Sequence, residues 1–363
     1  MNEWTDSVLG DVLPLKYGKN LPETKRISGD VPVYSSAGHI GFHDSAVVSE
    51  PSIIVGRKGS VGTVYYEQRA CFPIDTAFYT VGSDDINLRF GYYALLNANL
   101  SQHSQDSAVP GLNRDTYSSI PLSLPSAKEQ DAIAEVLAAL DDKIVANIKL
   151  ATTADELVRA EFDLMSSMCD EQITVGELVT NNRHSANPEL LATCVPYVGL
   201  EHIPRRFMWL QTHGDSSEVS SNKSHFEAGD VLFGKLRPYF HKIVSAPIAG
   251  ICSTDVLVLR PKTTELAGFI LAAISHDNVV RAVTAASQGT RMPRTGWNDL
   301  SAISIPWPGH QAAESFSSKV AVIREHVISI LAENQDLMAT RDALLPQLMS
   351  GTRRVKAIGD PTD

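Results

Sequence analysis

The sequence lacks the features of a membrane protein, a disulfide-stapled protein and a metalloprotein. No apolar run approaches the roughly 20 residues that span a bilayer, and residues 1–6 have neither the basic nor the apolar region of a signal peptide. The four cysteines, Cys71, Cys169, Cys194 and Cys252, are scattered without a Cys-x-x-Cys pair, so we expect small buried hydrophobic residues. These absences predict a cytoplasmic protein with no metal site and no membrane partner.

Catalytic motifs are missing as well. There is no Gly-x-x-x-x-Gly-Lys-Ser/Thr loop and no His-Glu-x-x-His pair, and residues 187–189 differ from the Asn-Pro-Pro-aromatic motif of an amino-methyltransferase. Gly56, Gly59 and Gly62 are wrongly spaced for a dinucleotide fingerprint, and a strand-like run follows them, so we expect a hairpin turn. The sequence therefore predicts a binding protein that is not an enzyme and holds no cofactor, although an enzyme with a convergent pocket stays a formal alternative.

A basic overall charge is also absent, because the net charge is −11. That balance counts against a protein that binds nucleic acid unaided. The charge is uneven, however: residues 234–294 contain eight Lys and Arg but only three Asp and Glu. We interpret this segment as a basic face and the acidic long helices as surfaces with a different task.

The chain contains an internal repeat, in which short strand-like runs recur in the same order with an offset that grows from 164 to 183 residues. Most of the growth falls between residues 203 and 231, which predicts an insertion in the second copy. The matched stretches are 31–34 with 195–198, 39–40 with 202–203, 53–57 with 231–235, 75–81 with 255–259, and 120–125 with 303–308. Each copy predicts strands first, then a short helix near residues 92–97 or 269–275.

A long amphipathic helix follows each copy. The first has a capping-box signal at Ser126 and Glu129. Apolar residues then recur at steps of mostly three and four, which is typical of a coiled-coil seam. The two seams are Ile133, Leu137, Leu140, Ile144, Ala151, Ala154, Val158 and Met165, and Phe316, Val320, Ile323, Val327, Ile330, Leu337, Leu344 and Leu348.

One asparagine lies on each seam, at Asn147 and Asn334, where a buried amide commonly fixes the register. At about 35 residues each helix would be about 50 Å long, and Pro346 should end or kink the second near Leu345. We expect the two helices to form an antiparallel coiled coil; the alternative is that both are core helices of ordinary domains.

Two pairs of loops carry the best candidates for nucleic-acid contact. Residues 56–59 and 234–239 occupy equivalent turns, and residues 111–114 and 289–294 form a second equivalent pair. Arg or Lys beside Gly can approach a phosphate or a guanine edge closely, although a solvated basic turn is the simpler alternative. The candidate DNA-binding residues are Arg57, Lys58, Arg114, Lys235, Arg237, Tyr239, Lys242, Arg291 and Arg294.

The pattern resembles a known family, the specificity subunits of type I restriction–modification systems, over essentially the whole chain. The similar stretches are Leu9-Gly10-Asp11-Val12 and its echo Val175-Gly176-Glu177-Leu178, residues 120–125 followed by Glu129-Gln130, residues 133–137, Asp141-Asp142-Lys143-Ile144, and residues 341–351. The second junction departs from the family pattern, because His310-Gln311 replaces the expected Glu-Gln pair.

The resemblance implies an α/β (α+β) fold with two β-rich globular target-recognition domains, separated by two long helices that form the antiparallel coiled coil. Residues 1–125 would be target-recognition domain 1 and residues 170–308 domain 2. Residues 126–169 and 309–350 would be the conserved helices, and residues 351–363 a flexible tail.

The resemblance also implies partners. Each domain would read one half of a bipartite site in double-stranded DNA, and the helices would dock two methyltransferase subunits, to which restriction (motor) subunits can be added. S-adenosylmethionine, and ATP with Mg²⁺ for restriction, would be bound by those partners. An alternative function is a protein-binding adaptor or decoy of a restriction–modification system, against which the basic segment 234–294 argues.

Overall fold

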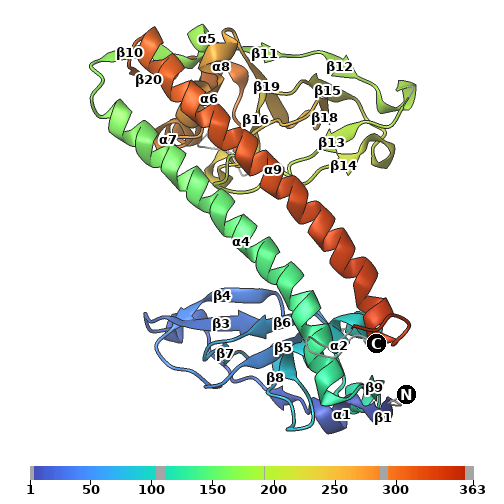
Figure 1. Cartoon of the computed structure of the whole chain (residues 1–363). Helices are drawn as coiled ribbons and strands as arrows, with labels where there is room; N and C mark the ends of the chain where they lie inside the picture. The colour runs from blue at the N-terminus through green and yellow to red at the C-terminus, as the bar shows by residue number, and fades with distance from the viewer. Residues whose placement is uncertain (1–3, 104–110, 192, 287–292, 356–363) are drawn as a thin grey trace. The chain divides into compact units, whose positions relative to one another are not determined.

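The computed structural model describes residues 4–103, 111–191, 193–286 and 293–355 of the chain. The chain divides into two compact units, which we call unit 1 (residues 1–144 and 336–363) and unit 2 (residues 145–335) (Figure 1). Two long helices contribute to both units. Helix α4 (Ala127–Ser166) passes from unit 1 to unit 2 after Ile144, and α9 (His310–Met349) returns to unit 1 after Gln335.

The centre of unit 1 is a four-stranded antiparallel sheet in the order β2-β8-β5-β6. A smaller sheet has the order β4-β3-β7, and β1 pairs with β9. The strands are β1 (Thr5–Val8), β2 (Lys16–Tyr17), β3 (Val31–Ser35), β4 (Gly38–His43), β5 (Ser52–Gly56), β6 (Val64–Glu67), β7 (Phe72–Pro73), β8 (Ala77–Thr80) and β9 (Pro121–Leu124). The helical segments before α4 are α1 (Leu9–Val12), η1 (Glu23–Lys25), α2 (Leu88–Asn97), η2 (Leu100–His103) and α3 (Arg114–Ser118).

Unit 2 is built in the same way. Its central sheet has the order β11-β19-β16-β17, and β10 pairs with β20. A five-stranded sheet in the order β12-β15-β18-β13-β14 completes it. The strands are β10 (Glu171–Thr174), β11 (Val179–Asn182), β12 (Ser185–Ala186), β13 (Pro196–Val198), β14 (Gly214–Asp215), β15 (Lys223–Phe226), β16 (Val231–Gly234), β17 (Ile243–Ser245), β18 (Gly250–Cys252), β19 (Val256–Pro261) and β20 (Ser304–Trp307).

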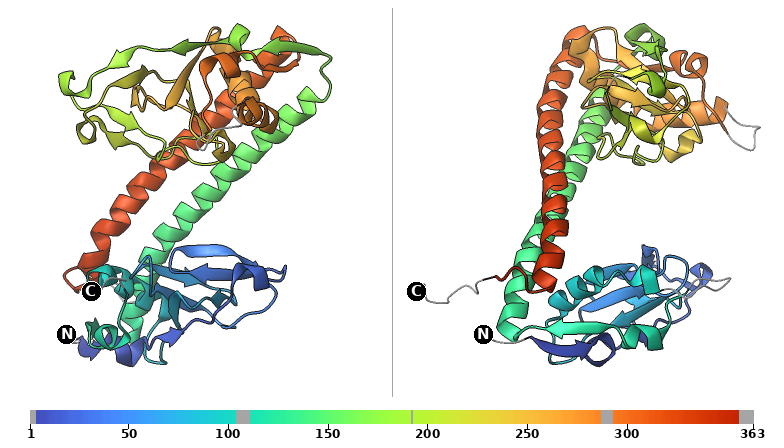
Figure 2. Two further views of the ribbon diagram at one scale, coloured as in Figure 1. Left: turned by 180° about the vertical axis from the view of Figure 1, so that it is seen from behind. Right: turned by 90° about the vertical axis from the view of Figure 1, so that its right-hand side faces the viewer.

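The helical segments of unit 2 cover its sheets and close its core. They are α5 (Val175–Leu178), η3 (Pro188–Leu190), η4 (Ser216–Glu218), η5 (Pro238–Phe240), η6 (Thr264–Leu266), α6 (Ala267–Ile274), α7 (Asp277–Ala286) and α8 (Trp297–Ser301). In both views of Figure 2 the strands of each unit lie to one side of the long helices.

The shared strand order confirms the internal repeat. The four-stranded sheets of the two units have the same connectivity, and each unit pairs its first strand with the strand that precedes its long helix. The second copy is larger where an insertion was expected, because β14 and β15 belong to residues 204–230. The repeat therefore consists of one fold that carries different peripheral segments.

The long helices pair antiparallel within each unit. In unit 2, Asn147 contacts Asn334, and Glu161 forms an ion pair with Lys319 at 3.6 Å. In unit 1, Arg341 Nη1 donates to Asp141 Oδ1 at 2.9 Å. The predicted seam residues are buried or half-buried, which confirms the coiled-coil pattern. The expectation for Pro346 was wrong in one respect, because α9 continues through it to Met349.

The helices are also part of each unit's core. The ring of Phe162 on α4 lies 5.7 Å from Phe269 on α6 and 6.1 Å from Phe316 on α9. In unit 1, Ile133 and Leu137 of α4 are buried together with Leu9 and Tyr117. The two alternatives for these helices are thus not exclusive: their seam pairs helix with helix, and the same apolar stripe closes the globular core.

Several features differ from the expectations. Helix α7 was not predicted, and Cys194 is exposed while Cys71 and Cys252 are buried. The residues that open the predicted tail are held in place: Arg354 Nη1 pairs with Glu129 at 3.4 Å, and Val355 packs against the core. Within the described residues, no single helix is long and apolar enough to cross a membrane; a bent pair of helices in residues 264–286 meets that test by length and composition alone.

Candidate nucleic-acid interface

The two candidate loops of unit 1 lie side by side. Lys58 forms an isolated antiparallel bridge with Gly111, and Leu112 N donates to Arg57 O at 2.9 Å. The hairpin turn predicted at the glycines joins β5 to β6, and Gly59 has a φ of +80°, a conformation that favours glycine. The turn and the second loop therefore form one surface element.

An aromatic ring joins the basic side chains of this element. The guanidinium carbon of Arg57 lies 4.8 Å from the ring centroid of Tyr17, and that of Arg114 lies 5.7 Å from it. The side chain of Tyr17 is half exposed. Because cation–π contacts hold a guanidinium over a ring while its N–H edge stays free, this cluster can donate hydrogen bonds outward.

The equivalent loops of unit 2 are also brought together. Leu236 bridges to Arg294, and Arg237 N donates to Pro293 O at 2.8 Å. Thr295 N donates to Lys235 O at 3.0 Å. The predicted residue Arg291 lies outside the described residues. Two loops that are some 55 positions apart in the sequence thus form the same paired element in each unit.

Three predicted cations of unit 2 are engaged by their own chain. Lys235 Nζ donates to Thr254 O at 2.5 Å, Lys242 Nζ donates to Leu200 O, and Arg294 is paired with Asp255. Burial lowers the pKa of Lys235, and the nearby positive charge of Arg294 lowers it further. These residues present positive charge, but part of their donor capacity is already in use.

Arg237 and Tyr239, in contrast, are exposed and form no side-chain hydrogen bond or ion pair within the described part of the chain. Arg237 has a φ of +49°, which is unusual for a residue other than glycine. Strained backbone of this kind clusters at functional sites. The guanidinium carbons of Arg205 and Arg237 lie 3.9 and 5.7 Å from the ring centroid of Phe240. The segment 237–240 therefore combines free donors with an aromatic ring.

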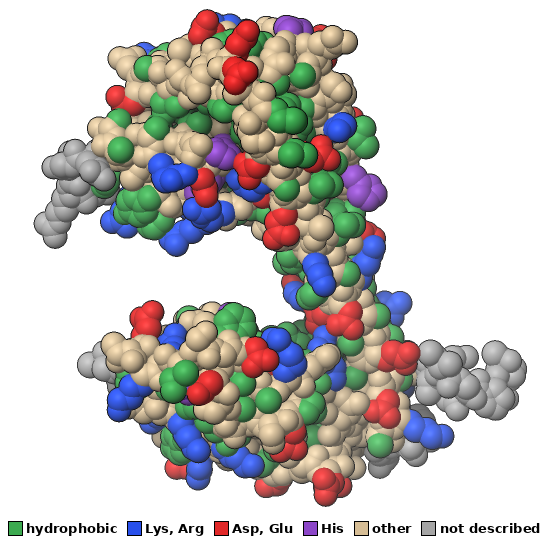
Figure 3. All heavy atoms as spheres, turned by 90° about the vertical axis from the view of Figure 1, so that its left-hand side faces the viewer, with side chains coloured by type: hydrophobic (Ala, Val, Ile, Leu, Met, Phe, Trp, Pro, Cys, Tyr) green, Lys and Arg blue, Asp and Glu red, His purple; other side chains and the backbone are tan. Residues whose placement is uncertain are grey.

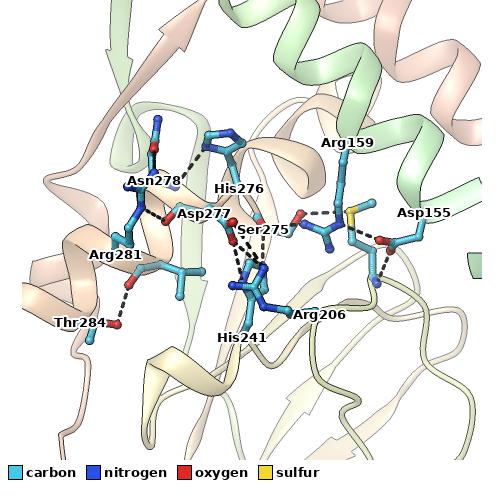
Figure 4. A network of polar contacts seen from close by, with 12 residues as sticks. Asp155, Arg159, Arg206, His241, Ser275, His276, Asp277, Asn278, Arg281 and Thr284 are labelled. Carbon is cyan, nitrogen blue, oxygen red and sulfur yellow. Dashed lines mark hydrogen bonds and ion pairs between the residues drawn. The ribbon is translucent and has the colours of Figure 1, made fainter. Parts of the chain in front are cut away.

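A polar network supports this segment from beneath (Figure 4). Arg206 Nη1 donates to Asp277 Oδ1 at 3.0 Å, and buried His241 Nδ1 lies 3.3 Å from the same oxygen. His241 Nε2 and Arg159 Nη1 both contact Ser275 O, at 2.6 and 2.9 Å. Burial lowers the pKa of His241 and so favours the neutral ring.

The same network reaches α4. Asp155 Oδ2 accepts from Arg159 Nε at 2.6 Å, and its Oδ1 accepts from Met208 N at 2.7 Å. Asp155 is almost fully buried. Because both carboxylate oxygens and the guanidinium are used, the network holds the loop that contains Met208 and the turn after α6 against one face of α4.

A cleft lies beside the paired loops of unit 2. It is lined by cationic and amide side chains from several segments: Asn181, Asn182, Arg183, Lys223, Lys235 and Arg294, with Trp297 as the aromatic wall. Figure 3 shows Lys and Arg side chains gathered along one edge of this unit. Among the described residues, no group of three His, Cys, Asp or Glu side chains could hold a metal ion.

The two seam asparagines meet inside unit 2. Asn147 Nδ2 donates to Asn334 Oδ1 at 2.9 Å and to Glu333 Oε2 at 2.8 Å. Both asparagines are buried, with 3% and 6% of their surface exposed. A buried amide pair of this kind is satisfied in one helix register and loses its partner in others.

Several residues of this surface were not found from the sequence: Tyr17, Arg183, Arg205, Phe240 and Trp297. Tyr17 and Arg183 follow short strands of low apolar content, and Arg205 lies inside the insertion, so no repeated motif marked them. The signal that could have found the first two is strand register, which requires the sheet.

Comparisons with known proteins point to one family. A family model described as the type I restriction modification DNA specificity domain matches residues 1–153. The EcoDI specificity subunit of a type I restriction enzyme from Escherichia coli is 21% identical over 354 aligned residues, which cover 84% of this chain and 78% of that protein. The EcoprrI specificity subunit, also from Escherichia coli, is 25% identical over 139 residues, 37% of this chain and 35% of that protein.

Among solved structures, the S subunit of a type I restriction–modification system from M. genitalium has the same fold. It aligns with a TM-score of 0.61 and 17% identity over 95% of this chain and 96% of that one. Such specificity subunits are the non-catalytic components of their systems. The comparisons confirm that the chain is related to the specificity subunits of type I restriction–modification systems.

Proposed function

We propose that this chain is a DNA-specificity subunit that recognises a bipartite target in double-stranded DNA. Residues 1–125 and 170–308 act as its two target-recognition domains, and each reads one half of the target. The observation that carries the proposal is the paired basic loops, which occur at equivalent places in both copies although their residues differ. Two unlike readers on one chain suit a split, asymmetric site.

The proposed contacts in the first domain are Arg57, Lys58 and Arg114. Those in the second are Lys235, Arg237, Tyr239, Lys242, Arg291 and Arg294. Arg237 and Tyr239 are the strongest candidates for contacts to base edges, because their polar groups are exposed and uncommitted among the described residues. The cations bound to their own backbone fit contacts to phosphates, which need charge more than free donor geometry.

The long helices are the proposed scaffold. Residues 126–169 and 309–350 would dock two methyltransferase subunits, and restriction subunits can join that assembly. S-adenosylmethionine, and ATP with Mg²⁺ where restriction occurs, would be bound by those partners. The net charge of −11 is compatible with this division, since partner subunits would supply much of the grip on the DNA backbone.

A domain exchange tests the proposal. Residues 1–125 are replaced by those of a relative with a different target, and methylated adenines are mapped in cells that express the chimaera with the methyltransferase. We expect one half of the methylated motif to change while the other half and the spacing stay the same. The reciprocal exchange of residues 170–308 should change only the other half.

Unchanged methylation after both exchanges would contradict the proposal. An adaptor or decoy function predicts a different outcome, in which no complex containing this chain protects DNA from nuclease digestion. An Asn298→Ala variant serves as the matched control for handling, because this exposed residue lies outside the proposed contacts. It should methylate the same motif as the unaltered chain.

A further inference from the structure

The strand registers of the two central sheets allow single positions to be equated. In unit 1, Val55 of β5 lies opposite Phe78 of β8. In unit 2, Phe233 of β16 lies opposite Leu257 of β19. Each pair comes one residue before the glycine that ends β5 or β16. Phe78 and Leu257 therefore occupy the same place in the two copies.

The neighbouring strand then matches Tyr17 with Arg183. Tyr17 of β2 lies opposite Phe78. Asn182, the last residue of β11, lies opposite Val258, so the next residue, Arg183, falls at the position that corresponds to Tyr17. An aromatic residue in one copy is thus replaced by an arginine in the other.

The reverse exchange occurs on the adjacent helix. Arg114 is the first residue of α3 and Trp297 is the first residue of α8. Arg57 and Lys235, which follow the two equivalent glycines, supply a second cation in each copy. Each copy therefore carries two cations and one aromatic residue at three equivalent positions: Tyr17, Arg57 and Arg114 in unit 1, and Arg183, Lys235 and Trp297 in unit 2.

We propose that these equivalent clusters are phosphate-binding sites, each of which holds a backbone phosphate of the bound DNA, with Arg183 as the principal cation of the unit 2 site. This inference rests on the proposed function and deepens it. The three unit 2 residues line one cleft together with Asn181, Asn182 and Arg294. The amides add neutral donors beside the cations, as suits an oxygen-rich anion.

The charges of the cleft support an anion. Arg183, Lys223, Lys235 and Arg294 line it with Asp299 as the acidic residue of the lining. The pKa of Lys235 is lowered by burial and then by the charges of Arg294 and Arg183. A phosphate would relieve this crowding of like charges. Within the described part of the chain, Arg183 forms no hydrogen bond or ion pair, so its donors are available.

A comparison of the copies argues for phosphate rather than a base edge. The copies are proposed to read different half-sites, so residues that read bases should differ between them. The cation–aromatic cluster is instead preserved in composition at matched positions. Contacts to the backbone position a protein without carrying sequence information, and a feature common to two different readers fits that task.

The test compares two alanine variants that each remove one positive charge. Arg183→Ala alters the cleft, and Arg281→Ala removes an exposed arginine of α7 that is outside the cleft lining. Each full-length variant is assembled with the methyltransferase, and its affinity for duplex DNA is measured over a range of salt concentrations. One duplex carries the mapped methylation motif and one does not.

We expect Arg183→Ala to weaken binding of both duplexes by a similar factor of roughly ten at low salt. The slope of log affinity against log salt should become shallower by about 0.9, as for one lost phosphate contact. The methylated motif should stay the same. Arg281→Ala should leave affinity and slope near those of the unaltered complex.

Three results would overturn the assignment. Equal behaviour of the two variants would remove Arg183 from the interface, and loss confined to the motif duplex would make it a base-reading residue. Binding of inorganic phosphate that depends on Arg183 without any effect on DNA affinity would identify a site for a free anion. If the unaltered complex binds neither duplex, the proposed function itself fails, which is a distinguishable outcome.

Discussion

Replacing Asn147 with alanine is expected to lower the free energy of unfolding of unit 2 by about 1–3 kcal/mol. The substitution removes two donated hydrogen bonds, to Asn334 Oδ1 at 2.9 Å and to Glu333 Oε2 at 2.8 Å. Because Asn147 and Asn334 are only 3% and 6% exposed, water does not readily replace the lost bonds.

The double replacement Asn147→Leu with Asn334→Leu should behave differently. Two apolar side chains of similar size leave no polar group of this pair buried, so the double variant should be about as stable as the unaltered chain or more stable. Each single leucine variant should be destabilised. The resulting coupling between the two positions is expected to be about 1–2 kcal/mol, and the double variant should lose the preference for one helix register.

The assay follows tryptophan fluorescence during urea unfolding. Trp4 is the one tryptophan of unit 1, whereas Trp209, Trp297 and Trp307 belong to unit 2, so a Trp4→Phe background confines the signal to unit 2. The four members of the double-mutant cycle are compared in that background. Additive single effects, or a cost below about 0.5 kcal/mol for Asn147→Ala, would refute the reasoning that the amide pair is energetically coupled.

Two further predictions concern the surface of unit 2 and its support. Arg237→Glu in the assembled complex should weaken binding of motif DNA by about tenfold or more, whereas Arg294→Glu should have a smaller effect because Arg294 is paired with Asp255; unaltered fluorescence anisotropy titrations for Arg237→Glu would remove it from the interface. His241 has a pKa lowered by burial, so the unfolded chain binds a proton at higher pH than the folded one, and stability should fall as the pH drops below about 6.5. His241→Gln should flatten this pH dependence in urea unfolding, and an equally steep profile would contradict the assignment.

The repeat and the helices could be predicted because their signals are local and redundant. The seam residues recur over many turns, and Asn147 and Asn334 stand out against an apolar stripe. The central strands β5 and β16 are short apolar runs that end in glycine and a basic residue, and these runs mark the same point in both copies. Patterns of this kind survive divergence because they define the core.

The composition of the candidate interface could not be predicted in full, for a physical reason. Tyr17 and Arg183 are equivalent only because both lie opposite matched residues of the central sheet, and strand register is set by pairing partners far apart in the sequence. The network around Asp155 likewise joins a helix residue to the backbone of Met208, 53 positions away. A residue that owes its role to such contacts carries no mark in its own neighbourhood.

The exchange of aromatic and cation between the copies has a consequence for how specificity changes. Tyr17 with Arg114 and Arg183 with Trp297 conserve the contents of a site but not the identity at either position. Selection for phosphate binding needs a positive charge beside a flat wall, and either arrangement supplies both. Base readout needs a particular donor at a particular place, so it should be concentrated in segments that the copies do not share, such as residues 204–230 and η5. A domain can then acquire a new half-site by changing those segments while its hold on the backbone is kept.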